Sequence, residues 1–440
     1  MHSPEAGFES RLNASGGSPS RLSATPGVGA PHIRAFRECV GACAIRRALT
    51  LAVVSVLLLL LASRPAQAQT LAVLHNFAGG SDGSDPESSL TPDGKGNFYG
   101  TTYAGGLGFG TVFELSPNRN GGWNETVLHS FTSADGANPV DAYVIFDSAG
   151  NLYGTTYYGG TSQSGVVFEL SPKGTGWAET VLHNFGVNAG DGLYPVNGLI
   201  MDAAGNLYGT TEIGYGSGGT VFELSPSESG WTEQVIYNGG VNAPDYFAGL
   251  AMDAAGNIFG VNEQTVFELS PNGSGGWIPT VIHTFPRQDG VGEGQDGTPV
   301  LDQAGNLYGT TYYGGVSQQG TVYKLSPGKN GKWSYKILHA FKGPLYGDGS
   351  YPCAGIVFDK AGDLYGTTSN GGKSRYGTVF ELIAPVHPGA AYKEKVLWSF
   401  NNTDGLEPNA GLILDSAGNL YGTTSAGGSS GYGVVFEVTP

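Results

Sequence analysis

One short sequence unit recurs seven times along this chain, and that recurrence constrains the fold more than any other feature. Each copy contains an aromatic residue followed by glycine and, in six of the seven, by a polar residue, and successive copies begin 49 to 57 residues apart. The seven aromatic residues are Tyr99, Tyr153, Tyr208, Phe259, Tyr308, Tyr365 and Tyr421. Such a period is typical of repeat architectures in which every copy forms one small structural unit.

Every unit contains four short segments with the composition of β-strands. In the third unit they are residues 180–185, 198–202, 206–211 and 220–224. β-branched and aromatic residues dominate these segments, and Gly, Asn, Asp or Pro bounds each of them. An Asp-x-x-Gly turn joins the second segment to the third, because Asp accepts backbone N–H bonds and Gly tolerates positive φ. Four antiparallel strands per unit predict an all-β fold, a seven-bladed β-propeller.

The order of the segments also predicts how the ring closes. The array begins with a strand of the first type at residues 71–77 and ends with a strand of the fourth type at residues 434–438. We therefore expect the N-terminal strand to pair in the last blade and complete it, which leaves no open sheet edge. A β-solenoid is the alternative architecture, although its repeats are usually shorter and need no such hairpins.

Residues 1–68 differ in kind from the repeats. Arg46 and Arg47 precede an apolar run over residues 48–62, and Ala66-Gln67-Ala68 then offers a small-x-small cleavage pattern. We predict an N-terminal extension and signal peptide over 1–68, cleaved after Ala68, and a propeller over 69–440. An uncleaved anchor is the alternative, but the run is short for a span of about 20 residues. We expect a secreted or periplasmic monomer without membrane contact after cleavage.

The chain is acidic, with a formal net charge of −16 at pH 7. Such a surface repels a phosphate backbone, so we expect no nucleic-acid partner. Cys353 is the one cysteine beyond residue 68. A lone thiol forms no internal disulfide, so the exported protein is expected to depend on packing for its stability.

Two residue types that often carry chemistry recur once per unit. One repeat position holds His75, His129, His183, His283 and His339, and another holds Glu114, Glu169, Glu223, Glu268, Glu381 and Glu437. Ring closure would spread each set around the molecule, so the histidines cannot share a metal and are expected to pack in the core or between blades. No zinc, calcium, phosphate-loop or Ser/His/Asp pattern is present, and we predict no catalytic residue, metal or cofactor.

A localised function is expected where the units differ. The loop after Tyr-Gly-Thr-Thr should lie on the same face as the Asp-Gly-x-x-Pro loop that enters each inner strand. Tyrosines beside carboxylates on this loop-rich face suit sugars, which stack apolar faces and bond polar groups. The candidate ligand-binding residues are Tyr103, Tyr157, Tyr158, Glu212, Tyr215, Tyr312, Tyr313, Arg375 and Tyr376. The alternative is that these residues only build the loops.

The units also resemble a known repeat. Asn-Leu-Tyr-Gly-Thr-Thr, a Gly-Gly loop and Val-Phe-Glu-Leu-Ser-Pro are similar to the GloVer tandem repeat of exported bacterial proteins described as choice-of-anchor. The resemblance covers residues 71–440. It implies an exported bacterial repeat protein and carries no biochemical activity with it.

Three functions remain open at this point. We favour a non-enzymatic binding or scaffold propeller whose ligand, a protein or a glycan, binds the loop-rich face. The alternative is a secreted carbohydrate-active enzyme, a hydrolase or lyase, with acidic residues at the central pore. A redox propeller with a quinone cofactor is a third possibility for which the sequence holds no dedicated motif. The fold alone does not choose, because propellers host many unrelated functions.

Overall fold

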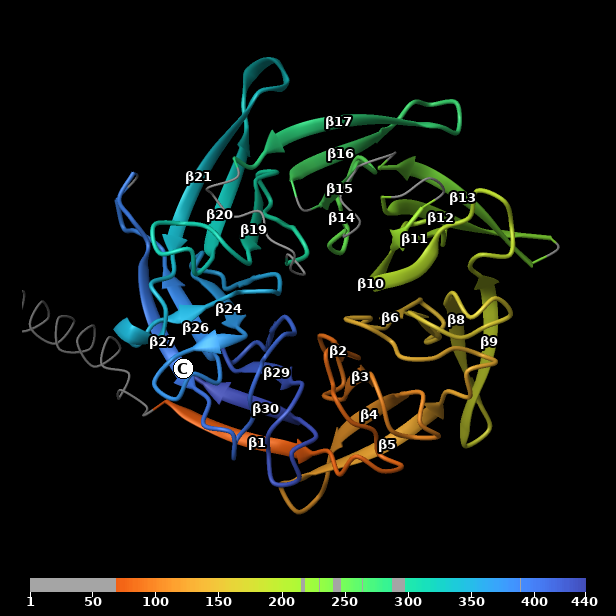
Figure 1. Ribbon diagram of the computed structural model, residues 1–440, viewed down its shortest axis with the longest axis horizontal. Coiled ribbons are helices and arrows are strands. Elements are labelled where there is room, and N and C mark those ends of the chain that lie inside the picture. The colour runs from red at the N-terminus through yellow and green to blue at the C-terminus, as the bar shows by residue number, and fades with distance from the viewer. Residues whose placement is uncertain are drawn as a thin grey trace, which may run out of the picture. The chain divides into compact units, whose positions relative to one another are not determined.

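Seven four-stranded antiparallel sheets follow one another around a central axis, as Figure 1 shows. This computed structural model describes residues 69–440 except 215–217, 229, 240–246, 263, 287–296 and 388. The predicted all-β, seven-bladed propeller is confirmed. The described residues include two short 3-10 turns, η1 (Lys329–Gly331) and η2 (Pro344–Tyr346). None of their helices has the length and apolar character needed to cross a bilayer. The predicted extension, signal peptide and cleavage site at Ala68 lie outside the described residues.

Each blade runs from an inner strand near the axis to an outer strand at the periphery (Figure 1). The inner strands are β2 (Thr91–Pro92), β6 (Ile145–Phe146), β10 (Leu193–Met201), β14 (Ala251–Met252), β18 (Val300–Leu301), β23 (Val357–Phe358) and β28 (Ile413–Leu414). The second strands are β3 (Phe98–Thr102), β7 (Leu152–Thr156), β11 (Leu207–Ile213), β15 (Ile258–Val261), β19 (Leu307–Thr311), β24 (Leu364–Thr368) and β29 (Leu420–Thr424).

The outer half of each blade is built from longer strands. The third strands are β4 (Thr111–Pro117), β8 (Val166–Lys173), β12 (Thr220–Ser227), β16 (Thr265–Pro271), β20 (Thr321–Pro327), β26 (Thr378–Ile383) and β30 (Val434–Thr439). The outer strands are β5 (Trp123–Ser130), β9 (Gly176–Asn184), β13 (Gly230–Asn238), β17 (Trp277–Thr284), β21 (Trp333–Ala340), β27 (Lys393–Ser399) and β1 (Thr70–Asn76). A separate two-stranded pair, β22 (Gly349–Ser350) with β25 (Asn370–Gly371), joins two loops of the sixth unit.

The N-terminal strand closes the ring. β1 pairs antiparallel with β30, from Thr70 opposite Thr439 to Asn76 opposite Val434, and it is the outer strand of the seventh blade. Directly after β1, the Phe77 ring is fully buried, and its backbone N–H donates to the carbonyl of Gly433 at 3.1 Å. The predicted closure by the N-terminal strand is therefore confirmed.

The repeated Tyr-Gly pair and the Asp turn are parts of the blade itself. An added Cβ on Gly209 would lie 2.5 Å from Cζ of Phe222, so the aromatic ring of the third strand requires glycine opposite it. The Tyr208 hydroxyl donates to Asp202 at 3.1 Å, and the Asn206 side chain donates to the same carboxylate at 2.8 Å. Burial opposes ionisation of Asp202, but these bonds outweigh it and lower its pKa.

The recurring histidines lie in five different sheets, one on each of five outer strands. Each packs edge-to-face against the phenylalanine two residues later, as His183 does on Phe185 at 4.7 Å and 79°. The predicted packing role is confirmed, and so is the separation of the histidines from one another.

Candidate functional site: a funnel at the centre of the ring

A cavity of about 340 Å³ lies on the ring axis, and we call it the central funnel. Residues from six of the seven blades line it, most of them in the segments that lead into the inner strands. Among them are Glu87, Asp141, Asn197, Cys353 and Asn409, one from each of five units. Near-equivalent positions of the repeat therefore meet at the funnel, and the side chains at these positions differ in type from one unit to the next.

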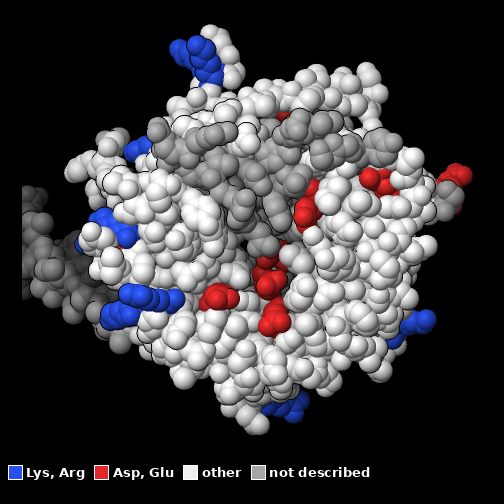
Figure 2. All heavy atoms as spheres, viewed as in Figure 1, with Lys and Arg blue, Asp and Glu red and all other residues white. Residues whose placement is uncertain are grey.

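Carboxylates gather on one side of the funnel. Burial, and then the charges of Asp85 and Glu407, raise the pKa of Glu87 to about 7. Burial also raises the pKa of Asp85. In the view of Figure 2, Asp and Glu side chains gather around the centre of the ring, whereas Lys and Arg lie at its edge. Glu87 therefore gains or loses its proton near neutral pH.

Two other funnel residues are held in uncharged states. Burial is the main cause that raises the pKa of the Cys353 thiol, which lies 3.5 Å from the Asn409 amide oxygen. A thiol kept neutral in this way is a poor nucleophile. Burial also raises the pKa of Tyr143 to about 12, and this ring fills the space beside Gly198, where an added Cβ would lie 2.5 Å from it.

Three tyrosines form a cluster on the loop-rich face, and two of them were predicted from the sequence. Tyr157 stacks on Tyr194 at 5.1 Å and 21°, and Tyr158 meets both rings edge-on. The Tyr157 hydroxyl donates to the carboxylate of Glu212, a third predicted residue. Tyr158 is 42% exposed, so this first tyrosine cluster presents an aromatic surface to solvent.

The same arrangement recurs between the fifth and sixth units. Tyr312 stacks on Tyr351 at 5.0 Å and 18°, and Tyr313, which is 38% exposed, lies edge-on to both. Sequence reasoning missed Tyr194 and Tyr351 as members of these clusters. Both precede the proline of an Asp-Gly-x-x-Pro loop and adopt a φ of 60°. The signal available in the sequence was a tyrosine directly before this proline. The structure shows that this position has a left-handed backbone conformation, which few residues other than glycine adopt without strain.

In the first and second units the two loops meet on one face, as predicted. Isolated bridges join Ser84 to Ala104 and Ala137 to Tyr158, which tie the loop entering the inner strand to the loop after the second strand. Tyr103 lies in the loop after the second strand of the first unit, and its backbone N–H donates to the Asp85 carbonyl at 2.9 Å. Burial raises the pKa of Tyr103, and the charges of Tyr158, Glu87 and Asp85 raise it further. Tyr103 therefore lies within electrostatic range of both the first tyrosine cluster and the funnel acids.

The remaining predicted residues are less well placed. Arg375 and Tyr376 lie exposed in a loop of the sixth unit, and the Tyr376 carbonyl accepts a bond from the Glu407 backbone at 3.1 Å. Neither side chain belongs to a tyrosine cluster formed by the described residues. Tyr215 lies outside the part of the chain that the structure describes.

Solved structures with the same architecture are distant in sequence. A catalytically inactive virginiamycin B lyase from Staphylococcus aureus, solved with quinupristin, is 13% identical with a TM-score of 0.52. The similarity covers 84% of this chain and 99% of the lyase. The extracellular domain of a putative hybrid two-component system from B. thetaiotaomicron is 13% identical with a TM-score of 0.50, over 86% of this chain and 43% of that one. These similarities support the propeller fold alone.

A third structure, the periplasmic gluconolactonase of Pseudomonas aeruginosa, is 14% identical with a TM-score of 0.45, over 70% of this chain and 84% of the lactonase. No curated protein matches the sequence.

The sequence itself matches one repeat family. The Gloeobacter/Verrucomicrobia repeat matches residues 62–176, 110–297 and 295–440. These three matches together span all seven blades, and they confirm the similarity to the GloVer repeat that the sequence motifs indicate. The chain belongs to the Gloeobacter/Verrucomicrobia repeat family.

Proposed function

We propose that this protein acts outside the cytoplasm as a binding propeller, and that its central funnel and tyrosine clusters take a glycan. The proposal rests on one observation above all, a chain of hydrogen bonds that links the first tyrosine cluster to the acidic residues through Tyr103. The Tyr103 backbone N–H donates to the Asp85 carbonyl at 2.9 Å, and the Asn138 side chain donates to the Tyr103 carbonyl at 3.0 Å. The Asn138 carbonyl in turn accepts the Tyr157 backbone N–H at 3.1 Å. Aromatic faces next to carboxylates match the two surfaces of a sugar, an apolar ring face and a rim of hydroxyl groups. The apolar leader of residues 48–62 supports export.

The size of the funnel favours a glycan over a protein ligand. Small-molecule sites occupy roughly 300–1,000 Å³, whereas a stable protein interface needs about 800 Å² from each partner. The funnel, at about 340 Å³, falls at the lower end of the first range. The exposed rings of Tyr158 and Tyr313 then extend this site along the rim, so a chain of several sugar units is the expected ligand.

Removing the first tyrosine cluster tests the proposal. We expect Tyr157→Ala combined with Tyr158→Ala to weaken glycan binding by about 5- to 140-fold, because each aromatic contact contributes roughly 0.5–1.5 kcal/mol. A glycan array followed by calorimetry measures the effect. Tyr346→Ala is the matched control, since Tyr346 is 73% exposed and lies outside both clusters. Unchanged affinity in the double variant, with the fold intact, would remove the tyrosine surface from the account.

One observation favours a carbohydrate-active enzyme as the second candidate. Glu87 has its pKa raised to about 7 beside the carboxyl groups of Asp85 and Glu407, and a carboxyl of raised pKa near a second carboxyl is the pairing that glycoside hydrolysis uses. In that case Glu87 donates a proton to the leaving oxygen.

Catalysis by Glu87 predicts a definite pH dependence. The neutral form is the active one, so kcat/KM is expected to fall as pH rises through about 7, and Glu87→Gln is expected to lower it by about 10²–10⁴. Reducing-end release from polysaccharides measures both effects. Turnover that survives Glu87→Gln would exclude this role, and the absence of turnover on substrates that bind would leave the binding function.

A further inference from the structure

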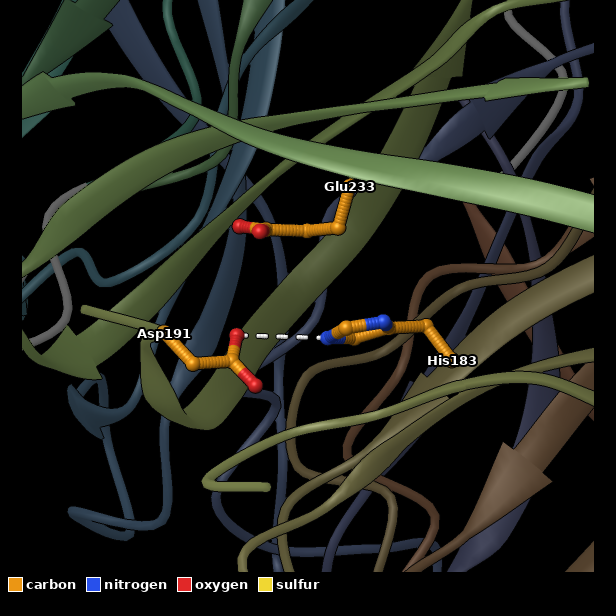
Figure 3. A group of neighbouring side chains, drawn as sticks. All are labelled: His183, Asp191 and Glu233. Carbon is orange, nitrogen blue, oxygen red and sulfur yellow. Dashed lines mark hydrogen bonds and ion pairs between the residues drawn. The ribbon is translucent and has the colours of Figure 1, made fainter. Parts of the chain in front are cut away.

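A histidine and two carboxylates meet between the second and third blades, as Figure 3 shows. His183 comes from β9, Asp191 from the loop that follows it, and Glu233 from β13 of the next blade. The His183 Nε2 atom lies 3.2 Å from Asp191 Oδ1, and one ligand atom from each of the three residues lies within 4.8 Å of the others. The Asp191 side chain is fully buried.

The same set is repeated at other blade interfaces. His339, Asp348 and Glu394 form a second such group between the fifth and sixth blades, with His339 Nε2 3.6 Å from Asp348 Oδ2. At two further interfaces His75 lies 3.7 Å from Asp82 and His129 lies 3.5 Å from Asp135. The strand register places Glu125 and Glu179 on the neighbouring blades at the position that Glu233 occupies in its own.

Histidine and glutamate also change together along the chain. On the third blade Tyr237 replaces the histidine, and Pro279 occupies the glutamate position of the fourth blade. On the sixth blade Trp398 replaces the histidine, and Leu71 occupies the glutamate position of the seventh blade. The interface that keeps His283 without a glutamate instead stacks that ring on Tyr335 at 4.2 Å and 13°. Repeats that lose one member of the pair thus lose or replace the other, which indicates that the two side chains serve one purpose.

One oxygen of the Glu233 carboxylate lacks a hydrogen-bond donor among the described residues. Its Oε1 atom is buried and makes no hydrogen bond to any described residue. A buried carboxylate beside a second carboxylate is stabilised by a positive charge that lies between them.

We propose that the His183–Asp191–Glu233 and His339–Asp348–Glu394 groups each bind one zinc-like divalent cation between neighbouring blades. One imidazole nitrogen with two carboxylate oxygens suits zinc better than calcium or magnesium, which prefer oxygen ligands alone. Zinc holds such ligands at about 2.0–2.2 Å in tetrahedral geometry, which puts ligand atoms roughly 3.3–3.6 Å apart. The 3.2 Å between His183 and Asp191 is close to this spacing, and the other ligand atoms lie within 4.8 Å, so the carboxylates would have to move inward around the ion. The cation would fasten adjacent blades, a role that no disulfide plays among the described residues, whose one cysteine is Cys353.

Metal counting on the purified protein tests the site. After chelator treatment and dialysis against Zn²⁺, we expect two tightly bound equivalents, one fewer in Glu233→Gln, and none at these sites in Glu233→Gln combined with Glu394→Gln. Glutamine keeps the shape of the side chain, and Asp191 is left alone because its carboxylate also accepts the Gly186 backbone N–H at 2.9 Å. Glu228→Gln, at an exposed turn, is the control.

Thermal unfolding gives a second readout that does not depend on any activity. Zn²⁺ is expected to raise the melting temperature of the protein and the control, and to raise that of the double variant less, because a ligand that binds the folded state stabilises it. Wild-type protein that binds no Zn²⁺, or equal Zn²⁺ binding by wild type and double variant, would overturn the proposal. Glutamate-dependent binding of Ca²⁺ in preference to Zn²⁺ would overturn the identity of the ion.

Discussion

A chain that begins at residue 78 is expected to unfold at a much lower temperature than one that begins at residue 69, and to aggregate when expressed. The shorter chain lacks β1, which forms the outer edge of the seventh blade along β30. It also lacks Phe77, whose ring is fully buried. Losing a buried phenylalanine side chain alone costs about 3–5 kcal/mol, against a whole-domain stability of about 5–15 kcal/mol.

The missing strand also changes what the surface exposes. Without β1, the β30 strand presents unpaired N–H and C=O groups at an open edge, and such edges pair with other chains. Thermal unfolding followed by circular dichroism, with light scattering for aggregation, compares the two chains. A synthetic peptide of residues 69–79 added to the shorter chain is expected to restore part of the lost stability. Equal melting temperatures for the two chains would show that β1 does not close the ring.

Gly209→Ala is expected to destabilise the protein by about 2–3 kcal/mol, although it adds a single methyl group. The added carbon would lie 2.5 Å from Phe222 Cζ and 2.8 Å from Leu199 Cδ2. Phe222 is fully buried and packs edge-to-face on Phe185 at 5.0 Å, so its ring has little room to move. Overfilling a packed core in this way costs about 1–3 kcal/mol.

Urea unfolding measures this effect, and two further variants make it specific. Gly176→Ala is the matched control on a strand, because no atom lies within 4 Å of the added carbon. Phe222→Leu in the Gly209→Ala background is expected to recover part of the loss, since a smaller side chain frees the space that the methyl group needs. A free energy of unfolding for Gly209→Ala equal to that of Gly176→Ala would contradict the packing argument.

The fold could be predicted because the repeated residues do the same work in every blade. Tyr208 and Asp202 hold one turn in the third unit, and their counterparts repeat those bonds in other units, so the period alone indicated a blade. Closure followed from the order of the strands at the two ends of the chain. The joint face of the variable loops followed from strand alternation within a blade.

The funnel could be predicted only in outline. Acidic residues at the pore were an expectation without residue numbers, because Glu87 and Glu407 are far apart in the chain and approach each other only after the ring closes. Tyr194 and Tyr351 were hidden as turn residues, and their role depends on stacking across two units.

The histidine clusters were missed for a different reason. The expectation that no metal binds rested on the separation of the histidines from one another. The fold confirms that separation. Carboxylates from the adjacent loop and the neighbouring blade were not considered, because the place of Glu233 beside His183 depends on how two blades pack.

A crystal structure with the tightest-binding oligosaccharide tests the central claim most directly, namely that residues peculiar to single units form the ligand site. The account predicts a sugar ring against Tyr158 or Tyr313, and hydroxyl groups within about 3.2 Å of the Glu87 carboxylate, which lines the funnel. A sugar bound instead at the uniform Asp turns or along the outer strands would contradict it.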